Sequence, residues 1–243
     1  MVIDHAAVGL IEQSELASGV AWSLCGTAMR LVGRVAFPLF AFMIAEGAVH
    51  TRDRRRYALR LLLLAVISEI PFDLVAGGTW LFPADQNTVF TLLLGLLAVW
   101  AGDLICGTGP GVSYGNREKT GDSGRKAVGQ RWFPLEYERY IRVLAAVPFG
   151  LAAYYLKTDY GFMGVLLIVI LYTLRTEPQL RTAVCAVFLF CMYMDFYGVA
   201  ACVAIFLINR YNGEKGGGSG RIFYLFYPLH LLVIRGIKMA VGL

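Results

Sequence analysis

Long apolar runs separated by short polar breaks recur along the whole chain, and they restrict its fold more than any other feature. A run of about 20 apolar residues crosses the roughly 30 Å hydrocarbon core of a bilayer. Charged residues make up only 16% of the 243 residues, against roughly 25% in ordinary soluble domains. The sequence therefore predicts an all-α, polytopic transmembrane helix bundle, and it excludes soluble enzymes and nucleic-acid-binding proteins. The predicted bundle is a single domain, 1–243, of about eight to ten hydrophobic segments, near 1–12, 29–50, 57–76, 88–105, 140–156, 159–175, 182–195, 196–209 and 222–241.

The basic residues are distributed unevenly between the polar breaks. Sixteen Lys and Arg residues lie at alternate breaks, whereas only Lys157 lies in the remaining ones. Because basic residues concentrate in the cytoplasmic loops of membrane proteins, we expect the amino terminus inside the cell and the carboxyl terminus outside. The net charge of +5 then reflects this topology, and it does not indicate a nucleic-acid partner.

Three local patterns complete the outline of the chain. Residues 182–209 are too short to cross a membrane twice, so they predict a short or re-entrant hairpin with Asp195 at its turn. The Gly-rich stretch at about 107–131 predicts a flexible cytoplasmic loop. The five cysteines form no CxxC pair and have no histidine at ligand spacing, so we expect neither a disulfide framework nor a metal site.

Ionisable and polar residues within the apolar segments are candidates for function, because charged groups in hydrocarbon cost at least about 2.5–3.5 kcal/mol each. On the predicted topology, six of them fall in the outer half and are expected to line an outward-facing polar cavity. Arg34 and Glu46 either form a structural ion pair or belong to the site. Glu69 and Asp73 also fit a solvated helix end. The six outer residues are Glu69, Asp73, Asn87, Asp159, Tyr160 and Asp195.

The chain contains three histidines, which differ in their surroundings. His50 follows an apolar run beside an arginine-rich break and is typical of an interfacial residue. His230 lies within the last segment, where a structural and a functional role fit equally well. His5 follows Asp4, but consecutive helical residues point about 100° apart. We therefore expect another segment, and not Asp4, to supply the partner of His5.

The basic run at 51–56 has two interpretations. It determines topology through the positive-inside rule. It also offers guanidinium groups to an anionic cytoplasmic ligand, such as the phosphates of coenzyme A. The residues that would bind such phosphates are Arg52, Arg54, Arg55 and Arg56.

Several strings along nearly the whole chain resemble the TraX family. They are GRVAFPLFAFMIAEG (33–47), LRLLLLAVISEIPFDL (59–74), NTVFTLLLGLLA (87–98), DYGFMGVLLI (159–168) and YLFYPLHLLVI (224–234). The family is similar to the wider group of transmembrane acyltransferases. The resemblance implies a bacterial cytoplasmic (inner) membrane location, acetyl-coenzyme A as acyl donor, and acetylation of the amino terminus of a conjugative pilin.

The resemblance also implies roles for individual residues. Asp4 and His5 match the Asp-His of the family's first helix, which makes His5 a general base or a transient acyl carrier. Arg34 matches the Gly-Arg of the second helix, and Glu46 matches its Glu-Gly. The remaining matches are Glu69 and Asp73 in SEIPFD, and Asn87, Asp159, Tyr160 and His230 in further motifs.

Two function classes follow from these observations, and a third, a non-catalytic membrane scaffold, would leave the buried Arg34, Glu46 and His5 without a use. The first is a membrane-embedded acyltransferase that moves an acetyl group to an amine or hydroxyl of a pilin, peptide, sugar or metabolite. The second is a proton- or cation-coupled secondary transporter, for which the weak similarity of 159–171 to 195–208 is the only sign of a repeat. The expected partners are acetyl-coenzyme A, an acyl acceptor and membrane lipid, and the sequence is compatible with a homodimer.

Overall fold

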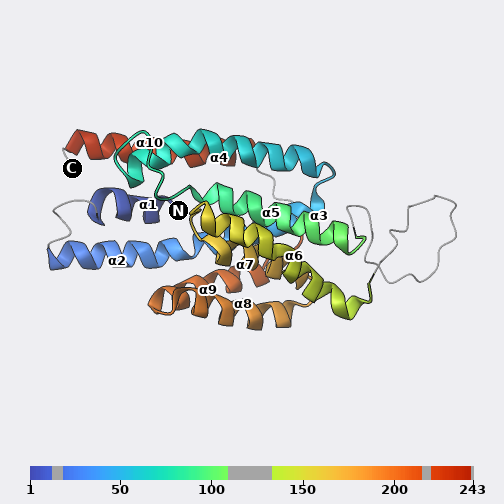
Figure 1. The fold of residues 1–243 in the computed structure, drawn as a ribbon. Coiled ribbons are helices and arrows are strands. Elements are labelled where there is room, and N and C mark those ends of the chain that lie inside the picture. Colours follow the sequence, from blue (N-terminus) through green and yellow to red (C-terminus); the bar gives the residue numbers. More distant parts are fainter. Residues whose placement is uncertain (13–18, 109–132, 215–219, 242–243) are drawn as a thin grey trace.

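The computed structural model describes residues 1–12, 19–108, 133–214 and 220–241. Within these ranges the chain forms helices, together with one isolated β-bridge between Gln86 and Thr158 (Figure 1). The architecture confirms the predicted all-α bundle, while most of the predicted loop at 107–131 lies outside the described residues. The helices are α1 (Val2–Ala6), the π-helix η1 (Ala7–Glu12), α2 (Val20–Arg34), α3 (Ala36–His50), α4 (Arg54–Ala76), α5 (Thr88–Ile105), α6 (Leu135–Tyr155), α7 (Gly161–Thr173), α8 (Pro178–Tyr193), α9 (Phe196–Asn209) and α10 (Gly220–Val241).

Helices α2 and α3 follow one another almost without interruption. They meet at Val35, and together they give a helical stretch of 31 residues, Val20–His50. Pro38 lies in the first turn of α3, where its missing N–H leaves no helical hydrogen bond unmade. The predicted start at residue 29 is wrong, because the small polar residues of the first turns of α2 lower the local hydropathy without preventing helix formation.

Apolar side chains cover much of the outer surface of the bundle. Among the described residues, three helical stretches are long and apolar enough to cross a membrane, namely Val20–His50, Thr88–Ile105 and Tyr224–Val241. Helix α4 adds exposed apolar side chains, including Leu63, Val66 and Ile67. A continuous apolar surface of this kind is unfavourable in water, and it is the surface expected to face lipid.

Helices α5 and α7 form the centre of the bundle, and α6 packs against both of them with its other face exposed. At Gly95 of α5, a Cβ would come within 2.3 Å of Ile168 of α7, so glycine allows these two helices to pack closely. Leu96, Leu167 and Leu171 are almost completely buried at this contact. The tight packing makes α5 and α7 the frame on which the outer helices are positioned.

The predicted hairpin at 182–209 is confirmed as α8 and α9. Met194 ends α8 in the left-handed conformation, with φ 52°. Asp195 begins α9, and its side chain accepts a hydrogen bond from the backbone N–H of Tyr197 at 2.8 Å. This combination of a left-handed stop and an aspartate cap produces a turn without a long loop. The hairpin lies along one side of the bundle (Figure 1).

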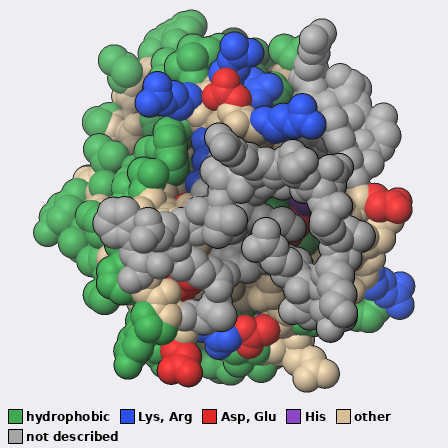
Figure 2. All heavy atoms as spheres, turned by 90° about the vertical axis from the view of Figure 1, so that its right-hand side faces the viewer, with side chains coloured by type: hydrophobic (Ala, Val, Ile, Leu, Met, Phe, Trp, Pro, Cys, Tyr) green, Lys and Arg blue, Asp and Glu red, His purple; other side chains and the backbone are tan. Residues whose placement is uncertain are grey.

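The two ends of the bundle differ in charge. We call the end that carries the start of α4 and the end of α7 the basic end, because exposed or half-exposed arginines, including Arg55, Arg139 and Arg175, gather there. Figure 2 views the molecule from this side and shows Lys and Arg side chains at its rim, with hydrophobic side chains along the flank. The opposite end carries the connections 77–87 and 156–160.

Candidate active site

Two histidines from distant parts of the chain form a buried pair. His5 of α1 and His230 of α10 are 8% and 6% exposed, and His5 Nδ1 lies 2.8 Å from His230 Nε2. The two imidazole rings are stacked, with centroids 5.1 Å apart. Another segment therefore supplies the partner of His5, as the sequence predicts.

The hydrogen bonds of the pair determine which nitrogen atoms carry protons. His230 Nδ1 lies 2.9 Å from the carbonyl oxygen of Phe226, and a carbonyl oxygen only accepts. His230 Nδ1 is therefore the donor, so Nε2 of a neutral His230 accepts from His5 Nδ1. The remaining nitrogen of His5, Nε2, then carries a lone pair. A neutral imidazole oriented in this way has the form required of a general base.

Asp4 contacts arginines of α2 and not the adjacent histidine. Asp4 Oδ1 lies 3.1 Å from Arg30 Nη1 and 3.6 Å from Arg34 Nη2. The two arginines are four residues apart and share one helix face. At Gly33 a Cβ would come within 2.4 Å of Asp4 Cβ, so glycine is required for this approach of α1 to α2.

Arg34 is surrounded by tyrosines. Its Nη1 donates a 3.4 Å hydrogen bond to the hydroxyl of Tyr160, and its guanidinium carbon lies 5.5 Å from the ring centroids of both Tyr193 and Tyr197. Tyr160 has φ 66°, an uncommon conformation for a bulky residue, and its ring stacks on Phe37. The aromatic rings stabilise the cation in an otherwise apolar environment.

Asp4, His5 and Arg34 border a cavity of about 420 Å³ near the 77–87 connection. Apolar side chains of η1, α4, α10 and the 77–87 connection form the rest of its wall. Asp159 receives a 2.6 Å hydrogen bond from the Thr88 hydroxyl, and Asp85 is exposed. We call this space the polar cavity, and its polar lining consists of Asp4, His5, Arg30, Arg34, Asp85 and Asp159.

Some residues predicted to line the cavity instead hold the 77–87 connection in place. The side chain of Asn87 caps α5 through Val89 N at 3.0 Å and also donates to Glu69. Asp73 accepts a 3.0 Å hydrogen bond from the backbone N–H of Phe82. These contacts attach the connection to α4, next to the polar cavity.

Two other predicted site residues lie away from the polar cavity. Asp195 is exposed at the turn between α8 and α9. Glu46 is about 18 Å along the helix from Arg34, at 1.5 Å per residue, and its carboxylate lies 3.4 Å from His50 Nε2. The ion pair between Arg34 and Glu46, one of the two alternatives for these residues, does not form.

The basic run divides into one buried and three exposed arginines. Arg52, Arg55 and Arg56 are exposed. Arg54 is only 6% exposed, and its Nη2 lies 2.5 Å from Asp103 Oδ2. The expected phosphate contact of Arg54 is therefore wrong, because this side chain already neutralises a buried carboxylate.

Asp103 of α5 is the centre of a second buried network. Its carboxylate also accepts hydrogen bonds from Arg142, from the hydroxyl of Tyr172 at 2.8 Å and from Thr108 at 3.2 Å. The network joins α4, α5, α6 and α7 at the basic end. The sequence signal for this network was the aspartate inside the apolar run 88–105.

Arg30 and Asp85 are the residues of the polar cavity that the sequence interpretation missed. Arg30 lies close to the predicted segment start at 29, where an arginine is typical of a membrane interface. Its position four residues before Arg34 was the available signal, because such residues share a helix face. Asp85 lies in an irregular connection, where the sequence pattern does not fix the direction of a side chain.

Comparison with known proteins identifies the family of this chain. The model of the family described as TraX protein matches residues 1–105 and 132–238. A relative described as "Probable fimbrial assembly protein FimC, serogroup H1", from Dichelobacter nodosus, is 25% identical over 265 aligned positions, which cover 98% of this chain and 91% of the relative. No solved structure matches the chain. The matched residues include both members of the histidine pair and every polar residue of the polar cavity, and the chain belongs to the TraX family.

Proposed function

We propose that this protein is a membrane acyltransferase in which His5 activates the acceptor and acetyl-coenzyme A is the acyl donor. The observation that carries the proposal is the series of hydrogen bonds from the Phe226 carbonyl through His230 to His5. It leaves a lone pair on Nε2 of a histidine that borders the polar cavity. Such an oriented neutral imidazole is the usual group for removing a proton from a nucleophile.

The proposed reaction transfers one acyl group from the thioester to the acceptor. His5 Nε2 takes a proton from the acceptor amine or hydroxyl while the acceptor atom forms a bond to the thioester carbonyl carbon. The carbon–sulfur bond breaks, and His5 returns the proton to the leaving thiolate. The positive charge that His5 carries in between strengthens its hydrogen bond from Nδ1 to His230. A transient acyl-histidine is the other route, in which Nε2 itself attacks the carbonyl carbon.

Arg34 is the candidate for stabilising negative charge on the thioester oxygen. Its guanidinium borders the same cavity as His5, and tyrosine contacts fix its position. A fixed cation in a site with little water stabilises a developing oxyanion more than a mobile, hydrated one does. Arg30 shares Asp4 with Arg34 and supplies a second positive charge at the same wall.

The acceptor is proposed to be an amine, and the carboxylates of the polar cavity support this choice. Asp85 and Asp159 lie in the cavity without an arginine partner among the ion pairs of the described residues. They favour a ligand that arrives as an ammonium ion, which releases one proton to solvent before His5 takes the second proton during transfer. The family and its fimbrial assembly relative favour the amino group of a pilin or another protein outside the cytoplasm.

The proposed orientation places the basic end in the cytoplasm and the polar cavity towards the outside of a bacterial membrane. The positive-inside rule supports it, because exposed arginines gather at one end of the bundle. Arg52, Arg55 and Arg56 would then meet the phosphates of the donor. The acceptor would approach from the opposite end.

The test is donor turnover by the purified protein in nanodiscs, with release of the coenzyme A thiol as the readout and a peptide amine as acceptor. His5→Ala is expected to reduce turnover by about 10²–10⁴-fold. His50→Ala is the matched control, because this exposed histidine lies at the basic end, and it should retain wild-type turnover. Undiminished turnover in His5→Ala would rule out the assigned base. Substrate flux without thiol release would instead identify a secondary transporter.

A further inference from the structure

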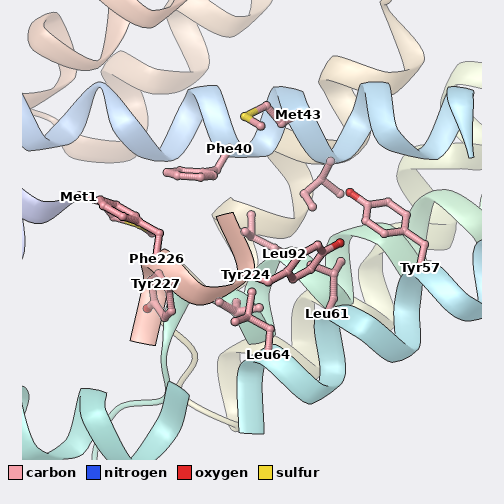
Figure 3. Close-up of a pocket in the computed structure, with 12 residues that line it drawn as sticks. Met1, Phe40, Met43, Tyr57, Leu61, Leu64, Leu92, Tyr224, Phe226 and Tyr227 are labelled. Atoms are coloured by element: carbon pink, nitrogen blue, oxygen red, sulfur yellow. The ribbon is translucent and has the colours of Figure 1, made fainter. Parts of the chain in front are cut away.

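A second cavity, of about 230 Å³, lies between α3, α4, α5 and α10 (Figure 3). No residue lines both this cavity and the polar cavity. We call it the apolar pocket, and its lining includes Met43, Tyr57, Leu61, Leu64, Tyr224 and Tyr227.

The order of residues along α4 places the apolar pocket between the basic end and the polar cavity. Arg55 and Arg56 are exposed at the start of the helix. Tyr57, Leu61 and Leu64 follow and line the apolar pocket. The next part of the helix, from Phe72 to Ala76, lines the polar cavity. A ligand in the apolar pocket therefore lies between the exposed arginines and the proposed reaction site.

The inner wall of the apolar pocket touches the histidine pair. Phe226 lines the pocket, and its ring stacks on His230 with the centroids 5.4 Å apart. Tyr227, also in the lining, meets His5 and His230 edge-on, at 6.2 and 5.4 Å between centroids. Only aromatic side chains separate a group in the pocket from the imidazoles along this wall.

The chemistry of the lining limits what the pocket can hold. The lining contains no charged side chain, so a phosphate group there would meet no cationic side chain. Tyr57 and Tyr224 contribute hydroxyl groups, which point into the space between α3 and α4 (Figure 3). A tyrosine combines an apolar ring with a single hydrogen-bonding group. The lining thus suits a mainly apolar ligand with a few hydrogen-bonding groups, such as amides.

Gly47 of α3 gives Tyr57 its place in the pocket. A Cβ at Gly47 would lie 2.6 Å from the Tyr57 hydroxyl oxygen, which is closer than van der Waals contact permits. The absence of a side chain on α3 therefore lets the phenol of α4 reach across between the two helices. This fit also gives a structural reason for the glycine of the Glu46–Gly47 motif.

The pocket is small. Its volume of about 230 Å³ has room for an extended chain one or two atoms wide, so the pocket suits a thin arm.

We propose that the apolar pocket binds the pantetheine arm of the acyl-coenzyme A donor. The arm is thin, largely apolar and carries two amides, which the hydroxyls of Tyr57 and Tyr224 would meet. It would run from the nucleotide phosphates near Arg55 and Arg56 to the aromatic wall of Phe226 and Tyr227, which contacts the histidine pair. This assignment rests on the proposed function, since it concerns the donor of that reaction.

Binding measurements on the purified protein in nanodiscs test the assignment with two probes. Coenzyme A carries the arm, whereas adenosine 3′,5′-bisphosphate carries the phosphates without it. Leu64→Trp places a large ring in the pocket and is expected to weaken binding of coenzyme A at least tenfold, while binding of the bisphosphate stays within twofold. Leu63→Trp is the matched control, because this neighbour on α4 is exposed on the apolar surface, and it should leave both affinities unchanged.

Removing the hydroxyls tests the contact with the amides. Tyr57→Phe and Tyr224→Phe should each weaken coenzyme A binding by about two- to tenfold, which is the usual effect of one lost hydrogen bond. Neither change should alter binding of the bisphosphate. Both phenylalanine variants keep the apolar volume of the pocket, so a loss specific to coenzyme A identifies the hydroxyl itself.

The possible results separate this assignment from the proposed function. If Leu64→Trp leaves coenzyme A binding unchanged, the assignment is overturned, and this is the result expected if a lipid tail fills the pocket. Equal weakening of coenzyme A and bisphosphate binding also overturns it. Wild-type protein that fails to bind coenzyme A overturns it as well. Arm-dependent binding without His5-dependent turnover would support the pocket and contradict the transferase. Wild-type turnover in Leu64→Trp would contradict the pocket assignment and support the transferase.

Discussion

The Asp4 cluster in the wall of the polar cavity and the Asp103 network contain the same charged groups in different surroundings. Each has one carboxylate that contacts two arginines. Asp103 is 2% exposed, and its oxygens are bound by Arg54 and Arg142 together with a tyrosine and a threonine. Asp4 holds Arg30 and Arg34 through one oxygen, at 3.1 and 3.6 Å, beside a cavity of about 420 Å³. A buried carboxylate whose two oxygens are both bound by several groups joins helices, whereas one with space beside it remains available to a ligand.

The largest effect expected from this comparison is on stability. Asp103→Asn leaves Arg54 and Arg142 buried without a counter-charge and should cost about 3–5 kcal/mol of unfolding free energy. Asp53→Asn is the control at the same end, because asparagine caps a helix as well as aspartate does. Unfolding in detergent, followed by denaturant or temperature, measures both. A stable Asp103→Asn protein would show that the network is not structural.

Arg34→Gln should affect catalysis more than folding, which is the opposite of the effect expected for Asp103→Asn. We expect turnover to fall by about 10²–10³-fold, the usual cost of losing an oxyanion-stabilising group. The stability of the protein should change far less than in Asp103→Asn, because Asp4 keeps Arg30 as its ion-pair partner. Equal losses of stability in the two variants would remove the distinction between the two clusters.

His230 acts on His5 and not on the substrate directly, so its replacement should have an intermediate effect. His230→Ala removes the acceptor for His5 Nδ1, at a cost of about 1–3 kcal/mol in transition-state stabilisation. His230→Asn offers an amide oxygen as acceptor and should recover part of the loss. The dependence of turnover on pH should change in the alanine variant and return towards wild type in the asparagine variant. A merely structural histidine would give no such recovery.

Gly33→Ala tests the close approach of α1 to α2. The new Cβ would lie 2.4 Å from Asp4 Cβ, and overpacking of this kind costs about 1–3 kcal/mol. Gly26→Ala, in the same helix, brings a Cβ only to 3.3 Å from Ile11 and should cost less. Turnover and unfolding free energy of the two variants give the comparison. If both behave alike, the Gly33 contact does not position Asp4.

Glu46→Gln should have the smallest effect. Its partner His50 is largely exposed, and ion pairs of this kind contribute about 0–1 kcal/mol. We expect near-normal turnover, because the carboxylate lies far from the polar cavity. A loss comparable to that of Arg34→Gln would show that the resemblance assigned Glu46 to catalysis correctly and that the structure places it in another state.

The helices and the hairpin were predictable because they depend on local patterns. Apolar runs gave the segments, and the short run at 182–209 with its central aspartate gave the turn at Asp195. The start of α2 was not found, since Ser23 and Thr27 make its first turns less apolar without making them less helical. Hydropathy indicates which segments can contact lipid, and a segment can form a helix without being that apolar.

The candidate site was only partly predictable for a different reason. His5, Arg34 and Asp159 were selected as ionisable groups in apolar segments, and they do meet at one cavity. Arg30 was missed because a basic residue at a segment boundary is usually interfacial. The contact between His5 and His230 spans 225 positions, and no local pattern in a single sequence encodes such a distance.

The same separation has a consequence for the order in which the candidate site is assembled. During synthesis, α1 to α9 emerge before α10, and domains begin to fold from the amino-terminal side. Until α10 has inserted, the nascent protein holds Asp4, Arg30, Arg34 and Asp159, but His5 lacks its partner and the polar cavity lacks the wall that Leu231 contributes. A ribosome that stalls before the last helix therefore leaves the candidate site without its oriented histidine pair.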